Sequence, residues 1–144
     1  MIRVITREPG KVEWNNNFTA RLLNVTDEKR RTRIVVRKGL EHILLKLEDV
    51  AMLYTENKVV FVYDREGKKY IGEKNLADIY TELDAKMFFR ANRQYIVNAE
   101  FVKSYKSYEK VKLQVSLTIP ELIQHSIIVS QENAPHFRKW FSDQ

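Results

Sequence analysis

From about residue 33 onward, the chain consists of short apolar runs separated by polar corners. Apolar and polar side chains alternate strictly from Lys110 to Leu117, which is typical of an antiparallel strand with one buried face. Many short strands with close turns predict a mostly β, antiparallel, multi-stranded fold of the sandwich or barrel type. The other predicted strands cover residues 33–37, 42–47, 50–55, 58–64, 68–72, 88–90, 95–98, 101–108 and 125–129.

The corners between these runs carry residues that favour turns. Residues 38–41 predict a hairpin connection, and residues 64–67 end in Gly67, which can adopt the positive φ that a tight turn needs. These connections are short, so neighbouring strands in the sequence are expected to pair as antiparallel hairpins.

Two segments have helical spacing instead. Asn75 is placed to cap a short internal helix over residues 76–83. A short C-terminal helix is expected after Ser130, with Ser130 as its N-cap and Glu132 in its first turn. Its apolar stripe is formed by Phe137, Trp140 and Phe141.

The positive charge of the chain is concentrated near its start. The net charge is +6, and residues 1–38 carry ten Lys and Arg against four Asp and Glu, whereas residues 39–144 carry fifteen of each. We therefore expect residues 1–31 to form a basic N-terminal extension or linker, with Trp14 and Phe18 in a short apolar anchor. Residues 32–144 are expected to form one domain.

Several classes of chemistry find no support in the sequence. The chain has no cysteine, its three histidines have no metal-ligand spacing, and its four glycines are isolated. We therefore expect no metal, no cofactor and no enzymatic activity. No apolar run is long enough to span a membrane, and the start lacks the apolar region of a signal peptide. These features predict a cytoplasmic protein without a membrane partner.

The segment from Phe88 to Asn98 is the most informative part of the chain. Two short apolar runs flank a basic, amide-rich corner, and such a bend directs side chains outward. Arginine matches the edge of guanine and an amide matches adenine, although an ordinary polar surface loop has the same composition. The polar residues of this corner are Arg90, Asn92, Arg93 and Gln94.

Three segments resemble the LytTR DNA-binding domain of the LytR/AlgR family of bacterial transcriptional regulators. Residues 89–102 resemble its core signature, residues 47–58 an earlier strand pair, and residues 127–130 its closing strand. The order of the segments also agrees with the family. This chain has Asn92 and Gln94 where the family has His and Ser, and Gln131 and Glu132 follow where Arg is common.

This resemblance implies a LytTR-like β fold that contacts duplex DNA through loops, with no recognition helix. The positions that match the family's DNA-contacting segments are Asn57, Lys58, Asn92, Arg93, Ser130 and Gln131. Arg90, Gln94 and nearby lysines would contact the phosphate backbone. The implied function is sequence-specific double-stranded DNA binding by a regulator of the two-component, response-regulator type. Repeated DNA sites, a homodimer on DNA and a sensor kinase or other regulator are the implied partners.

Two alternatives remain at the level of the sequence. The β domain could be a non-enzymatic protein-interaction module whose basic tail binds an acidic protein or a membrane surface. Tyr105 and Tyr108, which are interleaved with lysines, could form a stacking platform for single-stranded nucleic acid. Alternation in a sheet with one buried face explains the same two tyrosines. The lysines between residues 86 and 112 fit either a phosphate-binding patch or the protected edge of a sheet.

Overall fold

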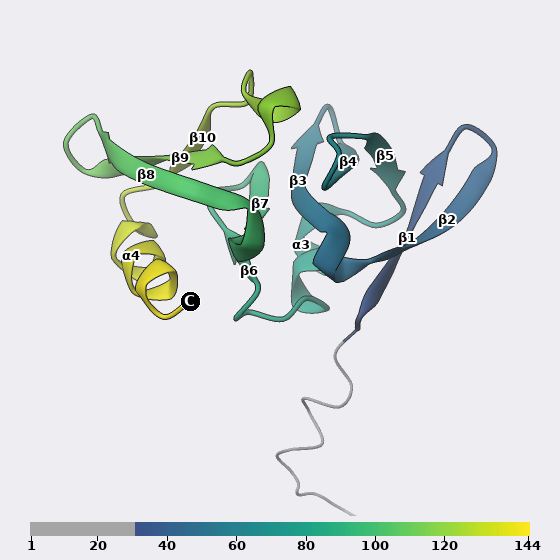
Figure 1. Cartoon of the computed structure of the whole chain (residues 1–144), viewed down its shortest axis with the longest axis horizontal. Helices are drawn as coiled ribbons and strands as arrows, with labels where there is room; N and C mark the ends of the chain where they lie inside the picture. The colour runs from purple at the N-terminus through teal and green to yellow at the C-terminus, as the bar shows by residue number, and fades with distance from the viewer. Residues whose placement is uncertain (1–30) are drawn as a thin grey trace, which may run out of the picture. The chain divides into compact units, whose positions relative to one another are not determined.

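The computed structural model describes residues 31–144, which form one compact unit (Figure 1). The predicted extension over residues 1–31, with its apolar anchor, lies outside these residues except for Arg31, and its boundary stays a prediction. Ten strands and two helices are seen in the described part, together with three 3-10 turns, η1 (Leu47–Asp49), η2 (Ala99–Phe101) and η3 (Pro120–Leu122).

Seven strands form one antiparallel sheet in the order β2-β1-β5-β4-β3-β7-β6. Their bounds are β1 (Arg33–Lys38), β2 (Glu41–Lys46), β3 (Val50–Glu56), β4 (Val59–Asp64), β5 (Lys69–Gly72), β6 (Phe88–Arg90) and β7 (Tyr95–Asn98). A second antiparallel sheet has the order β10-β9-β8, with β8 (Val102–Tyr108), β9 (Lys112–Leu117) and β10 (Ile127–Val129). The prediction of a mostly β, antiparallel fold is confirmed, and it takes the form of two sheets.

Strand β3, an interior strand of the large sheet, is buried on both faces over residues 50–53 because its side chains alternate between two apolar clusters. Met52 belongs to the cluster that the second sheet covers, and Leu53 belongs to the cluster on the other face. A register shift between Val50 and Met52 lets Ala51 and Met52 belong to the same cluster. The apolar run in the sequence therefore reflects a strand with no solvent-exposed face.

Each cluster includes side chains from one helix, and Figure 1 shows α4 beside the smaller sheet and α3 beside the larger one. The helix α4 (Ala134–Ser142) inserts Phe137, fully buried, into the cluster between the two sheets. The helix α3 (Leu76–Thr81) covers the opposite face of the large sheet with Leu76 and Ile79. Both helices are thus packing elements, and their apolar stripes are the reason that they dock.

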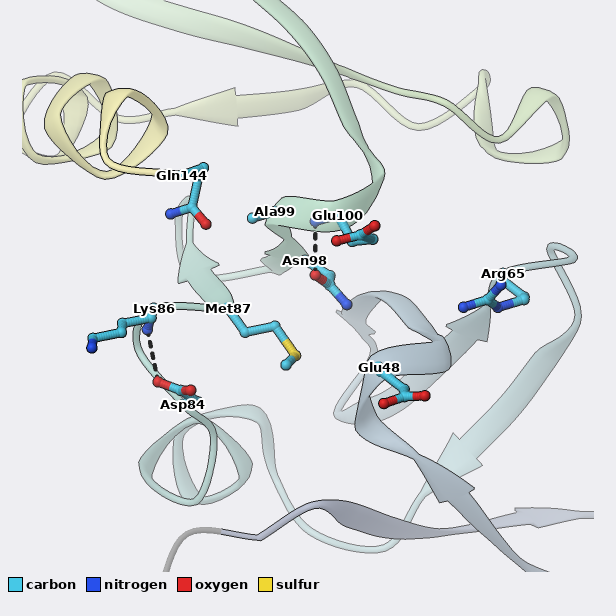
Figure 2. Close-up of a pocket in the computed structure, with 9 residues that line it drawn as sticks. All are labelled: Glu48, Arg65, Asp84, Lys86, Met87, Asn98, Ala99, Glu100 and Gln144. Carbon is cyan, nitrogen blue, oxygen red and sulfur yellow. Dashed lines mark hydrogen bonds between the residues drawn. The ribbon is translucent and has the colours of Figure 1, made fainter. Parts of the chain in front are cut away.

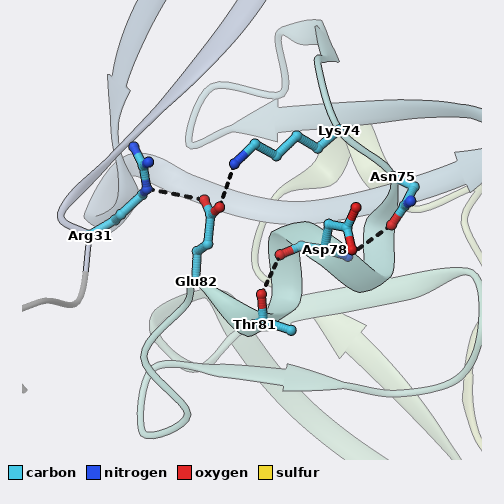
Figure 3. Close-up of polar contacts among 6 residues, drawn as sticks. All are labelled: Arg31, Lys74, Asn75, Asp78, Thr81 and Glu82. Atoms are coloured by element: carbon cyan, nitrogen blue, oxygen red, sulfur yellow. Dashed lines mark hydrogen bonds and ion pairs between the residues drawn. The ribbon is translucent and has the colours of Figure 1, made fainter. Parts of the chain in front are cut away.

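The predicted cap of the internal helix is confirmed. Asn75 Oδ1 accepts a hydrogen bond of 2.8 Å from the backbone N–H of Asp78 (Figure 3). After the helix, Glu82 forms two ion pairs (Figure 3). Its Oε1 lies 3.1 Å from Arg31 Nε, and its Oε2 pairs with Lys74 Nζ. These contacts join the first described residue to the end of α3, although exposed ion pairs of this kind stabilise only weakly.

Candidate nucleic-acid interface

Asn92 organises the corner between β6 and β7. Its Oδ1 accepts hydrogen bonds from the backbone N–H groups of Gln94, at 2.7 Å, and Tyr95, at 3.1 Å. Its Nδ2 donates a 2.6 Å hydrogen bond to the carbonyl oxygen of Ile128 on β10. The half-buried Asn92 side chain therefore shapes the corner and attaches it to the second sheet.

Arg90 also interacts with the backbone of this corner. Its Nε donates to the carbonyl oxygen of Asn92 at 3.3 Å, and its Nη2 donates to that of Arg93 at 3.2 Å. These two hydrogen bonds connect the guanidinium group to the backbone of the corner, and the Nη2 end of the group lies at the exposed surface. Arg90 is half-buried, as expected for a group that supports a loop.

Arg93 and Gln94 lie at the exposed tip of the corner. Gln94 pairs with Thr55 through its backbone carbonyl, which accepts from Thr55 N at 3.0 Å, and through a 3.4 Å contact from Nε2 to Thr55 O. Among residues 31–144, the guanidinium of Arg93 has no hydrogen-bond or ion-pair partner. Its donors are available to a ligand outside the protein.

The β3–β4 turn begins two residues after Thr55. Asn57 and Lys58 are exposed and have φ angles of 53° and 67°. They form the two-residue connection between the paired residues Glu56 and Val59, which is typical of a type I′ hairpin. The contact between Gln94 and Thr55 therefore holds this turn close to the corner.

The segment after β10 meets the same corner. Ser130 N donates to Ala91 O at 3.3 Å, so Ser130 lies beside the corner and Gln131 follows on the exposed side. The predicted N-cap at Ser130 is wrong. The segment first makes a turn in which Asn133 N donates to Ser130 O, and α4 begins only at Ala134 with no acidic residue in its first turn. Pro135, which needs no N–H partner, suits that later start.

The corner and the segment after β10 border one pocket of about 470 Å³. It collects residues from the corner, from α3 and from the segment that leads into α4. Two arginines and one carboxylate give it a positive local charge, which suits a phosphate group. The lining residues are Tyr80, Phe89, Arg90, Asn92, Arg93, Ser130, Glu132, Asn133 and His136.

A family model of the LytTr DNA-binding domain matches residues 41–142. This chain belongs to the LytTR family. A solved structure with a similar fold is a LytTr DNA-binding domain of a putative methyl-accepting/DNA response regulator from Bacillus cereus, with a TM-score of 0.66 and 21% identity. The match covers 76% of this chain and 96% of the other. A search of curated proteins found no match.

The family assignment confirms the predicted resemblance and the predicted fold. It also identifies DNA as the partner of this LytTR domain and places it among the DNA-binding domains of transcriptional regulators. The structure brings the three sequence segments of the resemblance together, since Thr55, Gln94, Ala91 and Ser130 are joined by hydrogen bonds.

His125 contacts Tyr95, the first residue of β7 after the LytTR corner. The sequence did not indicate this contact. Tyr95 Oη lies 3.0 Å from His125 Nδ1, and Tyr54 stacks on Tyr95 with a centroid distance of 4.7 Å. Burial raises the pKa of Tyr95 to about 12, and burial followed by the charge of Lys69 lowers the pKa of His125. Tyr95 Oη and His125 Nδ1 are therefore joined by a hydrogen bond whose donor depends on the tautomer of the imidazole ring.

Of the two tyrosines of β8, Tyr105 has a packing role. The Tyr105 ring contacts Phe137 and Phe141 on α4, with centroid distances of 5.4 and 5.0 Å. Tyr108 is 36% exposed, and Lys106 between the two tyrosines also faces solvent. Tyr105 is therefore occupied by its contacts with the helix.

A second pocket, of about 500 Å³, lies apart from the corner (Figure 2). Its lining combines three carboxylates, from Glu48, Asp84 and Glu100, with the cations Arg65 and Lys86. This balance of charge gives no net attraction for phosphate, and we assign the interface to the corner.

Within the described range, no group of three or more acidic or histidine side chains is arranged to hold a metal ion. His42 is paired with Glu73 at 2.8 Å. No helix between residues 31 and 144 is long and apolar enough to cross a bilayer.

Proposed function

We propose that this domain binds double-stranded DNA in a sequence-specific manner, with Arg93 contacting a base edge in the major groove. The observation that carries the proposal is the exposed guanidinium of Arg93, which has no hydrogen-bond or ion-pair partner among residues 31–144 and lies at the tip of a corner whose backbone is held by hydrogen bonds. The fork of donors on an arginine side chain suits the two acceptors of guanine, O6 and N7. Rigid backbone around it lowers the entropy lost on binding.

The residues around Arg93 have different roles in this proposal. Asn57 and Lys58 on one side, and Ser130 and Gln131 on the other, flank Arg93 and contact the adjacent backbone or bases. Arg90 and Gln94 support the corner and contribute to phosphate attraction. Asn92 is a positioning residue, because its Oδ1 and Nδ2 are both bonded within the protein.

We further propose how the domain acts as part of a transcriptional regulator. We place two copies of the domain on repeated DNA sites, under the control of a sensor kinase or another regulatory protein. The basic residues 1–31 would add non-specific affinity for phosphate, because they carry seven Lys and Arg against four Asp and Glu.

Selection of bound sequences from a random duplex pool, followed by a binding measurement, tests this function. Arg93→Ala should weaken binding to the selected site by about 1–3 kcal/mol and relax the preference at one base position. Arg37→Ala is the matched control, since it removes the same charge from an exposed residue of β1. It should leave the preferred sequence unchanged.

Equal site selection and affinity for Arg93→Ala and the unmodified protein would refute a base contact by Arg93. Single-stranded and random duplex competitors separate the alternatives in the same assay. Tighter binding to single strands than to any duplex would favour the stacking alternative. Absence of binding to every nucleic acid would favour a protein-interaction module.

A further inference from the structure

The β1–β2 hairpin has one buried face and one exposed face. Val36 is fully buried, and Ile34, Ile43 and Leu45 pack against the same apolar cluster. The residues between them point the other way, because successive side chains of a strand alternate. The exposed face is formed by the cross-strand pairs Arg33 with Lys46, Val35 with Leu44, and Arg37 with His42.

This exposed face has an apolar centre inside a basic border. Leu44 is 55% exposed and Val35 is 40% exposed, and they lie directly opposite each other. Arg33, Arg37 and Lys46 surround them and form no ion pair with a carboxylate among residues 31–144, and Glu73 is paired with His42. Half of the surface, β1, precedes the residues that the family model matches.

The open side of β2 adds a second recognition element. Within the described residues, β2 is the outermost strand at one end of the large sheet, and β6 is outermost at the other. β6 has only three residues, whereas β2 has six residues in uninterrupted register with β1. A long regular edge presents unpaired backbone N–H and C=O groups to another polypeptide, and proteins commonly shorten or interrupt such edges.

We propose that the β2 edge and the exposed face of the β1–β2 hairpin bind an extended acidic peptide of a partner protein, which adds a strand to the sheet. Main-chain hydrogen bonds to an exposed edge give affinity in this mode of binding, and alternate side chains give specificity. The peptide places an apolar side chain next to Leu44 and Val35. It places carboxylates two residues before and two residues after that position, next to the basic border.

The chemistry of the surface decides between this partner and others. A second copy of the hairpin would bring its own Arg33, Arg37 and Lys46 against the same cations, and like charges oppose that pairing. Duplex DNA would be attracted by the cations, but it would make no use of the apolar pair or of the open backbone edge. An acidic peptide with an apolar residue satisfies all three features.

A fluorescence titration of the full chain with a labelled synthetic peptide tests the proposal. The probe repeats Glu-Thr-Val-Thr, so that glutamate and valine share one face of an extended strand. Leu44→Glu should weaken its binding about tenfold or more. Leu40→Glu is the matched control: Leu40 lies at the tip of the same hairpin, is 99% exposed, and should bind the probe as the unmodified protein does.

A second probe tests the strand pairing with the unmodified protein. N-methylation of alternate residues on the edge-facing side of the peptide removes its backbone donors and should abolish binding. Unchanged affinity of the methylated probe, or equal affinity of the Leu44→Glu and Leu40→Glu variants, would overturn the proposal. If Leu44→Glu changes the sedimentation coefficient of the protein in the absence of peptide, the surface mediates self-association. If Leu44→Glu loses affinity for duplex DNA and Leu40→Glu does not, the surface binds DNA. Either result would also overturn the proposal.

Discussion

Asn92 illustrates why the identity of a polar residue does not reveal which way it faces. Its amide could contact adenine, yet Oδ1 accepts from two backbone N–H groups and Nδ2 donates to Ile128 O. Removal of such a side chain leaves these half-buried groups without partners, and an unsatisfied buried group costs more than a typical hydrogen bond contributes. Among residues 31–144, the side chain of the exposed Gln94 makes one hydrogen bond, to Thr55 O at 3.4 Å.

Asn92→Ala should therefore lower the free energy of unfolding by about 1–3 kcal/mol. Urea denaturation measures this change. Gln94→Ala, two positions away, should alter the stability by less than about 0.5 kcal/mol. A loss for Asn92→Ala no larger than that for Gln94→Ala would show that the corner does not depend on the Asn92 amide.

The sequence was sufficient to predict the corner itself. Apolar runs on both sides of residues 91–94 predicted two strands, and β6 and β7 confirm them. The inward orientation of Asn92 could not be predicted, because its partner Ile128 lies 36 residues away in the sequence. The support of Tyr95 by His125 was missed for the same reason, since it depends on a contact over 30 residues.

At the scale of elements, two hairpin turns contain residues in an unfavourable backbone conformation. Lys58 has a φ of 67° in the β3–β4 turn, and Lys110 has a φ of 70° in the β8–β9 turn. In this left-handed conformation, a residue with a side chain is about 1–2 kcal/mol less favourable than glycine, which adopts the conformation freely.

Lys58→Gly should raise the stability by about 0.5–1 kcal/mol and weaken duplex binding. Lys110→Gly is a matched control, because it relieves a similar φ and removes the same charge from a different turn. Thermal melts should shift upward for both variants, whereas salt-dependent titrations should show the larger loss of affinity, and a salt slope smaller by about 1, for Lys58→Gly. Equal losses of affinity would place DNA contact away from the β3–β4 turn.

The start of α4 differs from the predicted helix boundary. Ser130 is a favourable N-cap residue, and its backbone N–H is bonded to Ala91 across the sheet interface. The chain makes a turn from Ser130 to Asn133 before the helix begins. The apolar stripe of the helix was predicted correctly, because Phe137 packs in the core whatever the boundary is.

At the scale of the whole domain, Gly67 marks a close contact between the two layers. It lies in the β4–β5 turn with a φ of 80°, and a Cβ added there would lie 2.7 Å from Glu121 Cβ in η3. Gly39, in the β1–β2 turn, has a φ of 62° but nothing within 4 Å of such a Cβ. The two glycines therefore share the backbone requirement and differ in the space around them.

Gly67→Ala should destabilise the domain by about 2–3 kcal/mol, through backbone strain and displacement of η3. Gly39→Ala should cost only the strain, about 1–2 kcal/mol. Chemical denaturation of both variants gives the difference. Equal losses would show that the β4–β5 turn and η3 are not in close contact in solution.

The overall arrangement was only partly predictable from the sequence. Alternation located most strands, and hairpins such as β1–β2 and β3–β4 follow from short turns. The strand order β2-β1-β5-β4-β3-β7-β6 was not predictable, because it depends on pairing between distant strands such as β1 with β5 and β3 with β7. Local patterns carry no information about which distant edges meet.

The pairing of β3 with β7 has a consequence for synthesis of the protein in the cell. Met52, Leu53 and Tyr54 leave the ribosome well before their partners Val97, Ile96 and Tyr95. During that interval β3 can pair with β4, but its other edge and both of its apolar faces await later segments. A nascent chain at this stage exposes an edge that favours aggregation, and chaperones that shield apolar strands have most to protect at that point.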